Sequence, residues 1–214
     1  MGLNADQLQA AMTALCAIEP AFAVAVANKG HPAPRISERG FATLLRTILG
    51  QQVSVASAQS VWNKLDALVG GAADPANIAA ASDETLRSAG LSRQKLGYAR
   101  SLADEVTSGR LDLTNLPADD EEAIAALVRV KGIGRWSAEI YLLFAEGRAD
   151  IWPAGDLAVQ IEVGRILGHE DRPSEKLTRA LAEPWRPHRG AAAVFAWHHY
   201  GWRLRAGKAD KMPL

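Results

Sequence analysis

Two glycines separated by one apolar residue, Gly132-Ile133-Gly134, lie between two stretches in which apolar residues recur at helical spacing. Glycine allows the backbone to turn tightly and to expose its amide groups. Exposed amides at the start of a helix, here expected at Arg135, can bind a phosphate oxygen. Lys131 adds a positive charge next to them. The hairpin therefore predicts contact with a phosphate-containing ligand, although a plain connection between two helices has the same pattern.

Asp156 follows the segment Trp-Pro-Ala-Gly and precedes an apolar helical pattern that begins at Leu157. Aspartate at such a position is typical of a helix N-cap, and the helix dipole favours its charged form. A carboxylate near the anomeric carbon of a sugar can stabilise the positive charge that develops as a glycosidic bond breaks. It can also orient the attacking water. Asp156 is therefore the candidate catalytic residue, and a capping role is compatible with catalysis.

The combination of Gly-Ile-Gly-Arg-Trp at 132–136 and Pro-Ala-Gly-Asp at 153–156 is more specific than either motif alone. It resembles the helix-hairpin-helix DNA glycosylases, and within them the DNA-3-methyladenine glycosylase II branch, whose members excise alkylated purines. The resemblance covers about residues 37–203. It implies that the hairpin holds the DNA backbone without reading its sequence. It also implies that Asp156 is the catalytic aspartate of the family.

The expected fold is all-α, because helical spacing dominates and no segment is convincing as a strand. The resemblance implies two helical lobes, with a helix-hairpin-helix motif and an active-site cleft between them. We expect a single glycosylase domain over residues 1–214. Its central lobe should cover about 38–148, and its second lobe should combine about 1–37 with 149–214.

Capping residues indicate where several of these helices begin, because a short polar side chain can accept a hydrogen bond from the first free amides of a helix. Ser37 is expected to cap the helix that carries Phe41 and Leu44. The acidic run that starts at Asp119 is expected at the positive end of the helix that reaches Val130. The same capping signal is expected at Ser54, Asp74, Ser82 and Ser92.

The 24 basic residues balance the 24 acidic ones, which argues against a protein that coats nucleic acid through its net charge. Basic residues are nevertheless concentrated from Lys176 onward. A second set lies mid-chain and comprises Arg87, Arg93, Lys95 and Arg100. Either set fits solvated helix faces, or a surface that follows phosphates if it lies beside the hairpin.

Cys16 is the single cysteine, so neither a disulfide nor the four-cysteine iron–sulfur cluster of some relatives can form within the chain. The N-terminus lacks a signal-peptide pattern, and no apolar run is long enough to span a bilayer. We therefore expect a cytoplasmic protein with no membrane partner. No cofactor is expected, and the histidines lack the spacing of metal ligands. The resemblance also allows a backbone-bound monovalent cation at the hairpin.

Trp136 stands at the position that decides the reaction subtype. Relatives that also cleave the DNA strand carry a lysine here, as in Gly-x-Gly-x-Lys, and its amine forms a Schiff base with the sugar. Tryptophan has no such amine, and Lys131 precedes the glycines. The resemblance therefore implies a monofunctional enzyme that leaves an abasic site. A buried place in the core is the alternative for Trp136.

Three residues are expected to line the base pocket: Trp136, Ile140 and Trp197. Trp197 ends a segment from Trp185 that resembles the closing Trp-x-Pro-x-Arg…Trp stretch of alkylpurine glycosylases, in which the last tryptophan stacks on the extruded base. Purines alkylated at N3 or N7 carry a positive charge, which the face of an indole ring attracts. Ile140 replaces an aromatic residue of some relatives. Core packing remains the alternative for Trp197.

Gln51 and Gln52 lie in a loop that, by the resemblance, inserts a side chain into the duplex in place of the extruded nucleotide. Extrusion costs a few kcal/mol, so a residue must replace the lost stacking. Well-known relatives carry leucine where Gln52 stands, and glutamine could also hydrogen-bond the orphaned base. A polar loop between two helices is the alternative.

Together, these features predict a monofunctional DNA glycosylase of base excision repair that flips an alkylated purine, such as 3-methyladenine or 7-methylguanine, and hydrolyses its N-glycosidic bond. The expected partner is double-stranded DNA with alkylated bases, and the expected state is a monomer. Two alternatives stay open. The enzyme could act on another lesion, such as hypoxanthine or a mismatched base, or the chain could be a non-catalytic helix-hairpin-helix DNA-binding module.

Overall fold

The computed structural model describes residues 3–209 of the chain, and over that range all regular secondary structure is helical. The expected all-α class is thus confirmed. The chain forms two compact units. One comprises Met1–Ile36 and Leu142–Leu214, and the other is the continuous segment Ser37–Tyr141.

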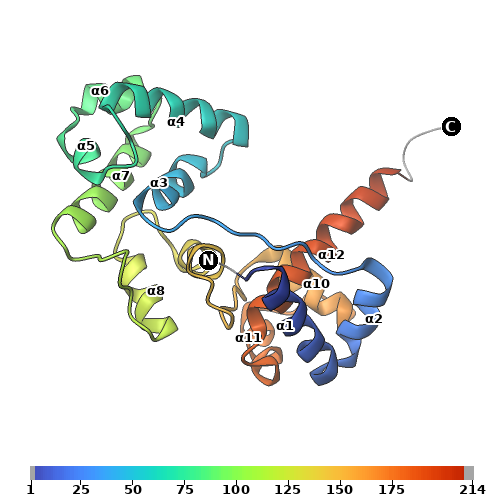
Figure 1. Ribbon diagram of the computed structural model, residues 1–214. Helices are drawn as coiled ribbons and strands as arrows, with labels where there is room; N and C mark the ends of the chain where they lie inside the picture. The colour runs from blue at the N-terminus through green and yellow to red at the C-terminus, as the bar shows by residue number, and fades with distance from the viewer. Residues whose placement is uncertain (1–2, 210–214) are drawn as a thin grey trace. The chain divides into compact units, whose positions relative to one another are not determined.

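The unit Ser37–Tyr141 is built around helix α7, which packs against α3 and α5 (Figure 1). Its core includes Leu44, Leu45 and Ile48 of α3, all fully buried, together with Leu102 of α7. The helices of this unit are α3 (Phe41–Gly50), α4 (Val55–Val69), α5 (Pro75–Ala80), α6 (Asp83–Ser88), α7 (Arg93–Thr107), α8 (Asp120–Val128) and α9 (Arg135–Tyr141).

The other unit has an aromatic core. The ring of Phe22 packs edge-on against Trp185 at 5.0 Å and against Phe195 at 5.8 Å, and Trp152 packs edge-on against Trp185 at 5.6 Å. Its helices are α1 (Ala5–Ile18), α2 (Pro20–Lys29), the π-helical turn η1 (Leu142–Glu146), α10 (Leu157–Ile166), α11 (Glu175–Leu181), the 3-10 turn η2 (Glu183–Trp185) and α12 (Arg189–Ala209).

Most of the expected caps are present. The side chains of Ser54, Asp74, Ser82 and Ser92 each accept a hydrogen bond from a backbone amide in the first turn of α4, α5, α6 and α7.

The cap expected at Ser37 is wrong, because α3 begins after Gly40, which leaves Ser37 too far from the first free amides of the helix. The N-cap residue is Gly40, which has no side chain that could accept a hydrogen bond from the helix. The backbone amide of Gly40 donates to the hydroxyl of Tyr141 at 2.8 Å.

The helix that follows the hairpin changes its geometry part-way. It begins at Arg135, as expected, is α-helical to Tyr141 and is π-helical from Leu142 to Glu146. The division between the two units falls at this change, rather than near residue 148. Single π-helical turns occur frequently at functional sites.

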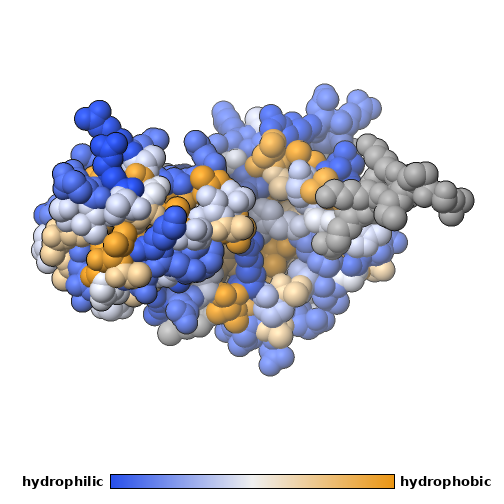
Figure 2. Space-filling view, turned by 90° about the horizontal axis from the view of Figure 1, so that it is seen from above, coloured by the Kyte–Doolittle hydropathy of each residue, from blue (hydrophilic) through white to orange (hydrophobic). Residues whose placement is uncertain are grey.

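Hydrophilic side chains cover most of the face seen in Figure 2, and apolar residues appear there in small separate groups. Across the described residues, no helix combines the length and the apolar character that crossing a bilayer would require.

Gly190 provides a test of the packing of α12. A β-carbon at this position would lie 2.5 Å from the carbonyl oxygen of Ala149 and 2.8 Å from the Leu143 side chain. We predict that Gly190→Ala lowers the free energy of unfolding by about 1–3 kcal/mol, because a backbone atom cannot move away cheaply. Gly97→Ala, inside α7 with open space around it, is the matched control. It should stabilise the protein by about 0.5–1 kcal/mol. Urea denaturation of both variants measures the difference, and equal effects would contradict this packing.

Candidate DNA-binding and catalytic site

The hairpin between α8 and α9 is a tight turn held by buried apolar side chains. Val130 and Ile133 are both buried. Gly132 has a φ of 87°, a conformation that L-residues with a side chain rarely adopt. A β-carbon on Gly132 would also lie 2.2 Å from the ring of Tyr98 on α7. Glycine is therefore required at position 132 for both conformation and space.

The turn leaves two of its amides available to a ligand. The Lys131 amide donates to the Ser101 hydroxyl at 3.0 Å, and the Ile133 amide donates to the Val130 carbonyl at 3.0 Å. Over residues 3–209, the amides of Gly132 and Gly134 have no acceptor within the protein. Gly134 is exposed, as is the side chain of Lys131. The geometry is thus suited to binding an anionic oxygen.

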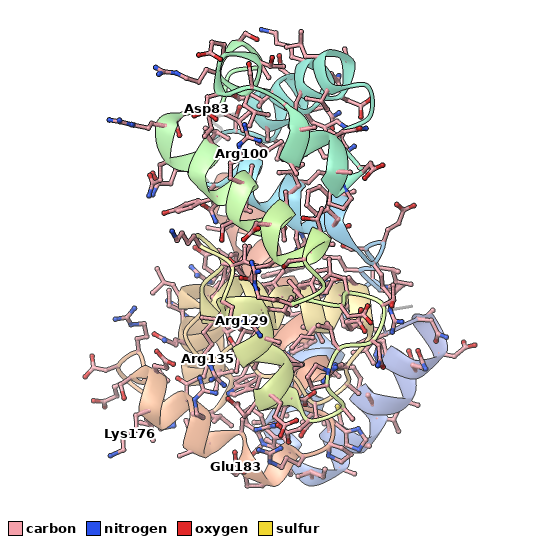
Figure 3. The ribbon with its side chains drawn as sticks, turned by 90° about the vertical axis from the view of Figure 1, so that its left-hand side faces the viewer. Asp83, Arg100, Arg129, Arg135, Lys176 and Glu183 are labelled. Carbon is pink, nitrogen blue, oxygen red and sulfur yellow. The ribbon has the colours of Figure 1, made fainter. Side chains whose placement is uncertain are left out.

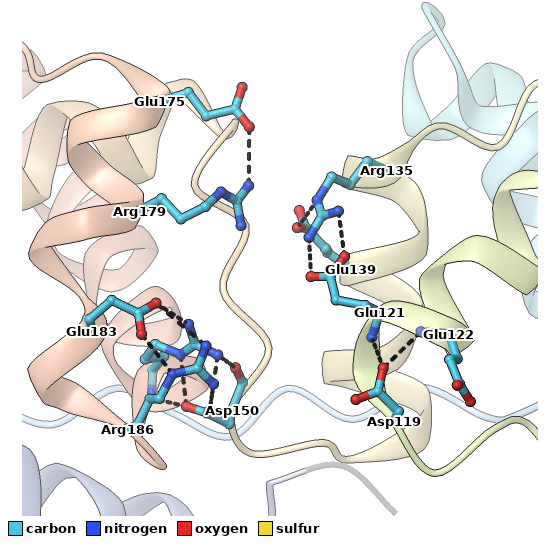
Figure 4. A network of polar contacts seen from close by, with 11 residues as sticks. Asp119, Glu121, Glu122, Arg135, Glu139, Asp150, Glu175, Arg179, Glu183 and Arg186 are labelled. Carbon is cyan, nitrogen blue, oxygen red and sulfur yellow. Dashed lines mark hydrogen bonds and ion pairs between the residues drawn. The ribbon is translucent and has the colours of Figure 1, made fainter.

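Arg135, the first residue of α9, is held by two carboxylates. Its Nε donates to Glu139 at 2.9 Å and its Nη1 donates to Glu121 at 2.8 Å (Figure 4). The hydrogen bond to Glu121 is the main reason that the pKa of Arg135 lies above its usual value. Glu139 is buried, so this pairing fixes the start of α9 and largely balances the charge of Arg135.

Asp156 is the N-cap of α10, as expected, and it is partly exposed to solvent. Its carboxylate accepts a hydrogen bond from the Val159 amide at 3.0 Å. The loop before it is anchored at two points. The Trp152 indole donates to the Thr178 carbonyl of α11 at 3.1 Å, and the Gln160 side chain donates to the Ala154 carbonyl at 2.8 Å. These buried bonds fix the position from which the carboxylate projects.

The three candidates for the base pocket differ in their surroundings. Trp136 leaves 48% of its surface exposed, so it is not the core residue that was considered as an alternative. Ile140, one turn later on α9, is partly exposed. Trp197 on α12 is also partly exposed and packs against Phe144, with the ring centroids 5.5 Å apart.

The loop between α3 and α4 carries a strained residue. Gln52 has a φ of 58° and is exposed, which is uncommon for a residue other than glycine. The side-chain amide of the neighbouring Gln51 donates to the Gly132 carbonyl at 2.8 Å. The structure therefore brings this loop and the hairpin together within one unit. The motifs located each segment but contained no signal for a bond between residues 81 positions apart.

Two basic residues of the mid-chain set, Arg100 and Lys95, bond to backbone carbonyls within the fold. The guanidinium of Arg100 donates to the carbonyls of Ile78, Ala79 and Ala81 at the end of α5, and it pairs with Asp83 (Figure 3). Lys95 donates to a carbonyl in α3, and burial lowers its pKa.

Two arginines of the C-terminal basic set are likewise paired. Arg189 is buried and forms ion pairs with Asp150 and Glu183. Arg186 pairs with the same two carboxylates (Figure 4). The hydrogen bond from Arg186 is the main cause that lowers the pKa of Glu183. Counting charges along the sequence could not distinguish these pairs from solvated residues.

The matching family is described as HhH-GPD superfamily base excision DNA repair protein, and the match covers residues 45–187. That span is more than half of the chain and contains the loop, the hairpin and Asp156. The chain belongs to this superfamily. The solved structures include that of a superfamily relative, the DNA-3-methyladenine glycosidase of Bacillus halodurans. It is 28% identical, with a TM-score of 0.82 over 96% of this chain and 94% of that one.

A second solved structure of a superfamily relative is the 3-methyladenine DNA glycosylase of Schizosaccharomyces pombe in complex with abasic DNA. It is 26% identical, with a TM-score of 0.69 over 89% of this chain and 94% of that one. A putative DNA-3-methyladenine glycosylase of Bacillus subtilis is 25% identical over 72% of this chain. The present chain covers 56% of the length of that relative.

Replacing the two hairpin glycines in turn tests this geometry. Gly132→Ala should lower the free energy of unfolding by about 2 kcal/mol or more, because its β-carbon would meet Tyr98 in a strained conformation. Gly134→Ala has open space around it and should change stability by less than about 0.5 kcal/mol. Urea denaturation of the two variants measures both effects. Equal losses of stability would show that the turn does not have this conformation.

Proposed function

We propose that this protein is a monofunctional DNA glycosylase that extrudes an alkylated purine from duplex DNA and hydrolyses its N-glycosidic bond. The observation that carries the proposal is Asp156, a partly exposed carboxylate at a fixed helix N-terminus, inside the region that matches the base excision repair family. The names of the similar glycosylases support alkylated purines as the substrate class. The proposed partner is double-stranded DNA, and the proposed functional state is a monomer.

In this mechanism the bond between C1′ and the base nitrogen breaks, and its electron pair leaves with the base. An N3- or N7-alkylated purine is already cationic, so it departs as a neutral molecule. Positive charge then develops on the sugar, and the Asp156 carboxylate stabilises it. Water adds to C1′ and loses a proton, which Asp156 can accept, and an abasic site results.

The remaining residues have supporting roles in the proposal. The amides of Gly132 and Gly134 bind a backbone phosphate, with Ile133 packing the turn and Lys131 adding charge. Among the described residues, the amides of Gly132 and Gly134 have no acceptor within the protein, which supports this assignment.

Two further groups of residues contact the bases. Gln52 fills the space of the extruded nucleotide, and its exposed, strained conformation supports this assignment. Trp136, Ile140 and Trp197 contribute to the base pocket, where an indole face attracts a cationic purine.

Replacing the carboxylate with an amide tests the proposal directly. Asparagine caps helices as well as aspartate does, so Asp156→Asn should keep the fold and lose only the charge. We predict that it reduces single-turnover release of 3-methyladenine or 7-methylguanine from duplex DNA by about 100-fold or more. Asp74→Asn, which changes the N-cap of α5 in the same way, is the matched control and should retain full activity.

Undiminished base release by Asp156→Asn would remove this residue from the mechanism. Identifying the bases that the unmodified protein liberates from methylated genomic DNA tests the substrate class separately. Release of hypoxanthine or a mismatched base, without alkylpurines, would contradict the proposed substrate.

The absence of a lysine at position 136 leads to a different test. A strand-cleaving glycosylase forms a Schiff base with the sugar, and borohydride reduces it to a stable covalent adduct. We predict that borohydride traps no adduct between this protein and lesion-containing duplex. A lyase of the same family serves as the positive control. Efficient trapping of this protein would reveal an amine nucleophile and rule out the monofunctional mechanism.

A further inference from the structure

Side chains of α7 contact both segments to which we assign DNA contacts in the unit Ser37–Tyr141. Lys95, Tyr98 and Ser101 are spaced three residues apart, so each lies next to the following one on the surface of the helix. Lys95 Nζ donates to the Leu49 carbonyl in the last turn of α3, at 2.6 Å. Tyr98 packs against Gly132, and the Ser101 hydroxyl accepts the bond from the Lys131 amide. The end of α3, just before the loop, and the hairpin are thus both held by side chains of α7.

Gln51 joins the two segments directly. It is the C-cap residue of α3, and its side-chain amide donates to the Gly132 carbonyl at 2.8 Å. That bond fixes the peptide group between Gly132 and Ile133, which lies between the two amides assigned to phosphate binding. Gln51 directly precedes Gln52 in the chain, so fixing the side chain of Gln51 also restricts the backbone of Gln52.

Gln52 needs such support because its backbone conformation is unfavourable. A residue other than glycine in the left-handed region persists when its surroundings hold it there. The supports that the structure provides on the N-terminal side are the Lys95 bond to Leu49 and the Gln51 bond to Gly132. On the C-terminal side, Ser54 caps α4.

We propose that Gln51 is a positioning residue that couples phosphate binding at the hairpin to insertion of Gln52 into the duplex. This inference rests on the proposed function and extends it. With the bond in place, the loop that carries Gln52 is held in a fixed position relative to the hairpin that binds the phosphate. Without it, the hairpin still holds DNA, while Gln52 is poorly oriented to replace the extruded base.

The coupling predicts a dependence on base pairing, because extrusion is easier when the target base has no partner. Gln51→Met keeps the size of the side chain and removes the donor. On a lesion paired with thymine, this variant should lose about tenfold in single-turnover base release, as expected for one hydrogen bond. On the same lesion opposite an abasic site, the loss should be about twofold or less. DNA affinity, measured by fluorescence anisotropy, should stay within about twofold.

Two further variants separate positioning from a general loss of structure. Gln51→Leu also removes the donor without adding a charge beside the hairpin, and it should reproduce the dependence on pairing if Gln51→Met proves unstable. Gln9→Met, at an exposed site on α1, makes the same chemical change away from both segments and should have no effect. Equal losses on paired and unpaired lesions, or no loss on either, would overturn the inference.

A readout that does not depend on excision distinguishes this inference from the proposed function. Fluorescence of 2-aminopurine at the target position rises when the base leaves the stack, and Gln51→Met should reduce that rise at saturating protein. If the wild type raises the fluorescence but releases no base, the proposed glycosylase activity fails and the coupling stands. The coupling is wrong if the wild type and Gln51→Met raise the fluorescence equally, or if neither raises it.

Discussion

The first four amides and the last four carbonyls of an α-helix have no partner inside the helix, and every such group needs one from elsewhere. The segments assigned to catalysis, phosphate binding and insertion each lie at a helix end, where such groups bond to partners outside the helix or stay available to a ligand. At the start of α10 the partner is the Asp156 carboxylate. Near the start of α9, two amides of the hairpin have no acceptor among the described residues. At the end of α3, the carbonyl of Leu49 takes a lysine from α7.

These helix ends explain how a chain with no net charge could act on a polyanion. Paired arginines such as Arg100 and Arg189 stabilise the fold, so they do not form a general basic surface. Backbone amides with unused hydrogen-bonding capacity can instead bind phosphate locally. In the proposed reaction, Asp156 supplies the negative charge that the breaking bond requires. Its position depends on buried anchors, especially the indole of Trp152, rather than on flexible surface residues.

Local patterns predicted much of this architecture, because capping and helical spacing depend on residues a few positions apart. Asp156 and Ser54 cap helices as expected. The expectation at Ser37 failed because α3 begins only after Gly40, whose amide bonds to Tyr141, about a hundred positions away. The bond from Gln51 and the burial of Arg189 likewise depend on tertiary contacts that sequence spacing does not encode.

The most direct test of the central claim compares two abasic-site analogues in duplex DNA. A pyrrolidine analogue carries a positive charge in the sugar ring, like the transition state, whereas a tetrahydrofuran analogue is neutral. If Asp156 faces the reacting sugar, the wild type should bind the cationic duplex about 100-fold more tightly than the neutral one. Asp156→Asn should lose that preference while binding the neutral duplex normally. An equal preference in both proteins would show that the charge on Asp156 does not act on the sugar.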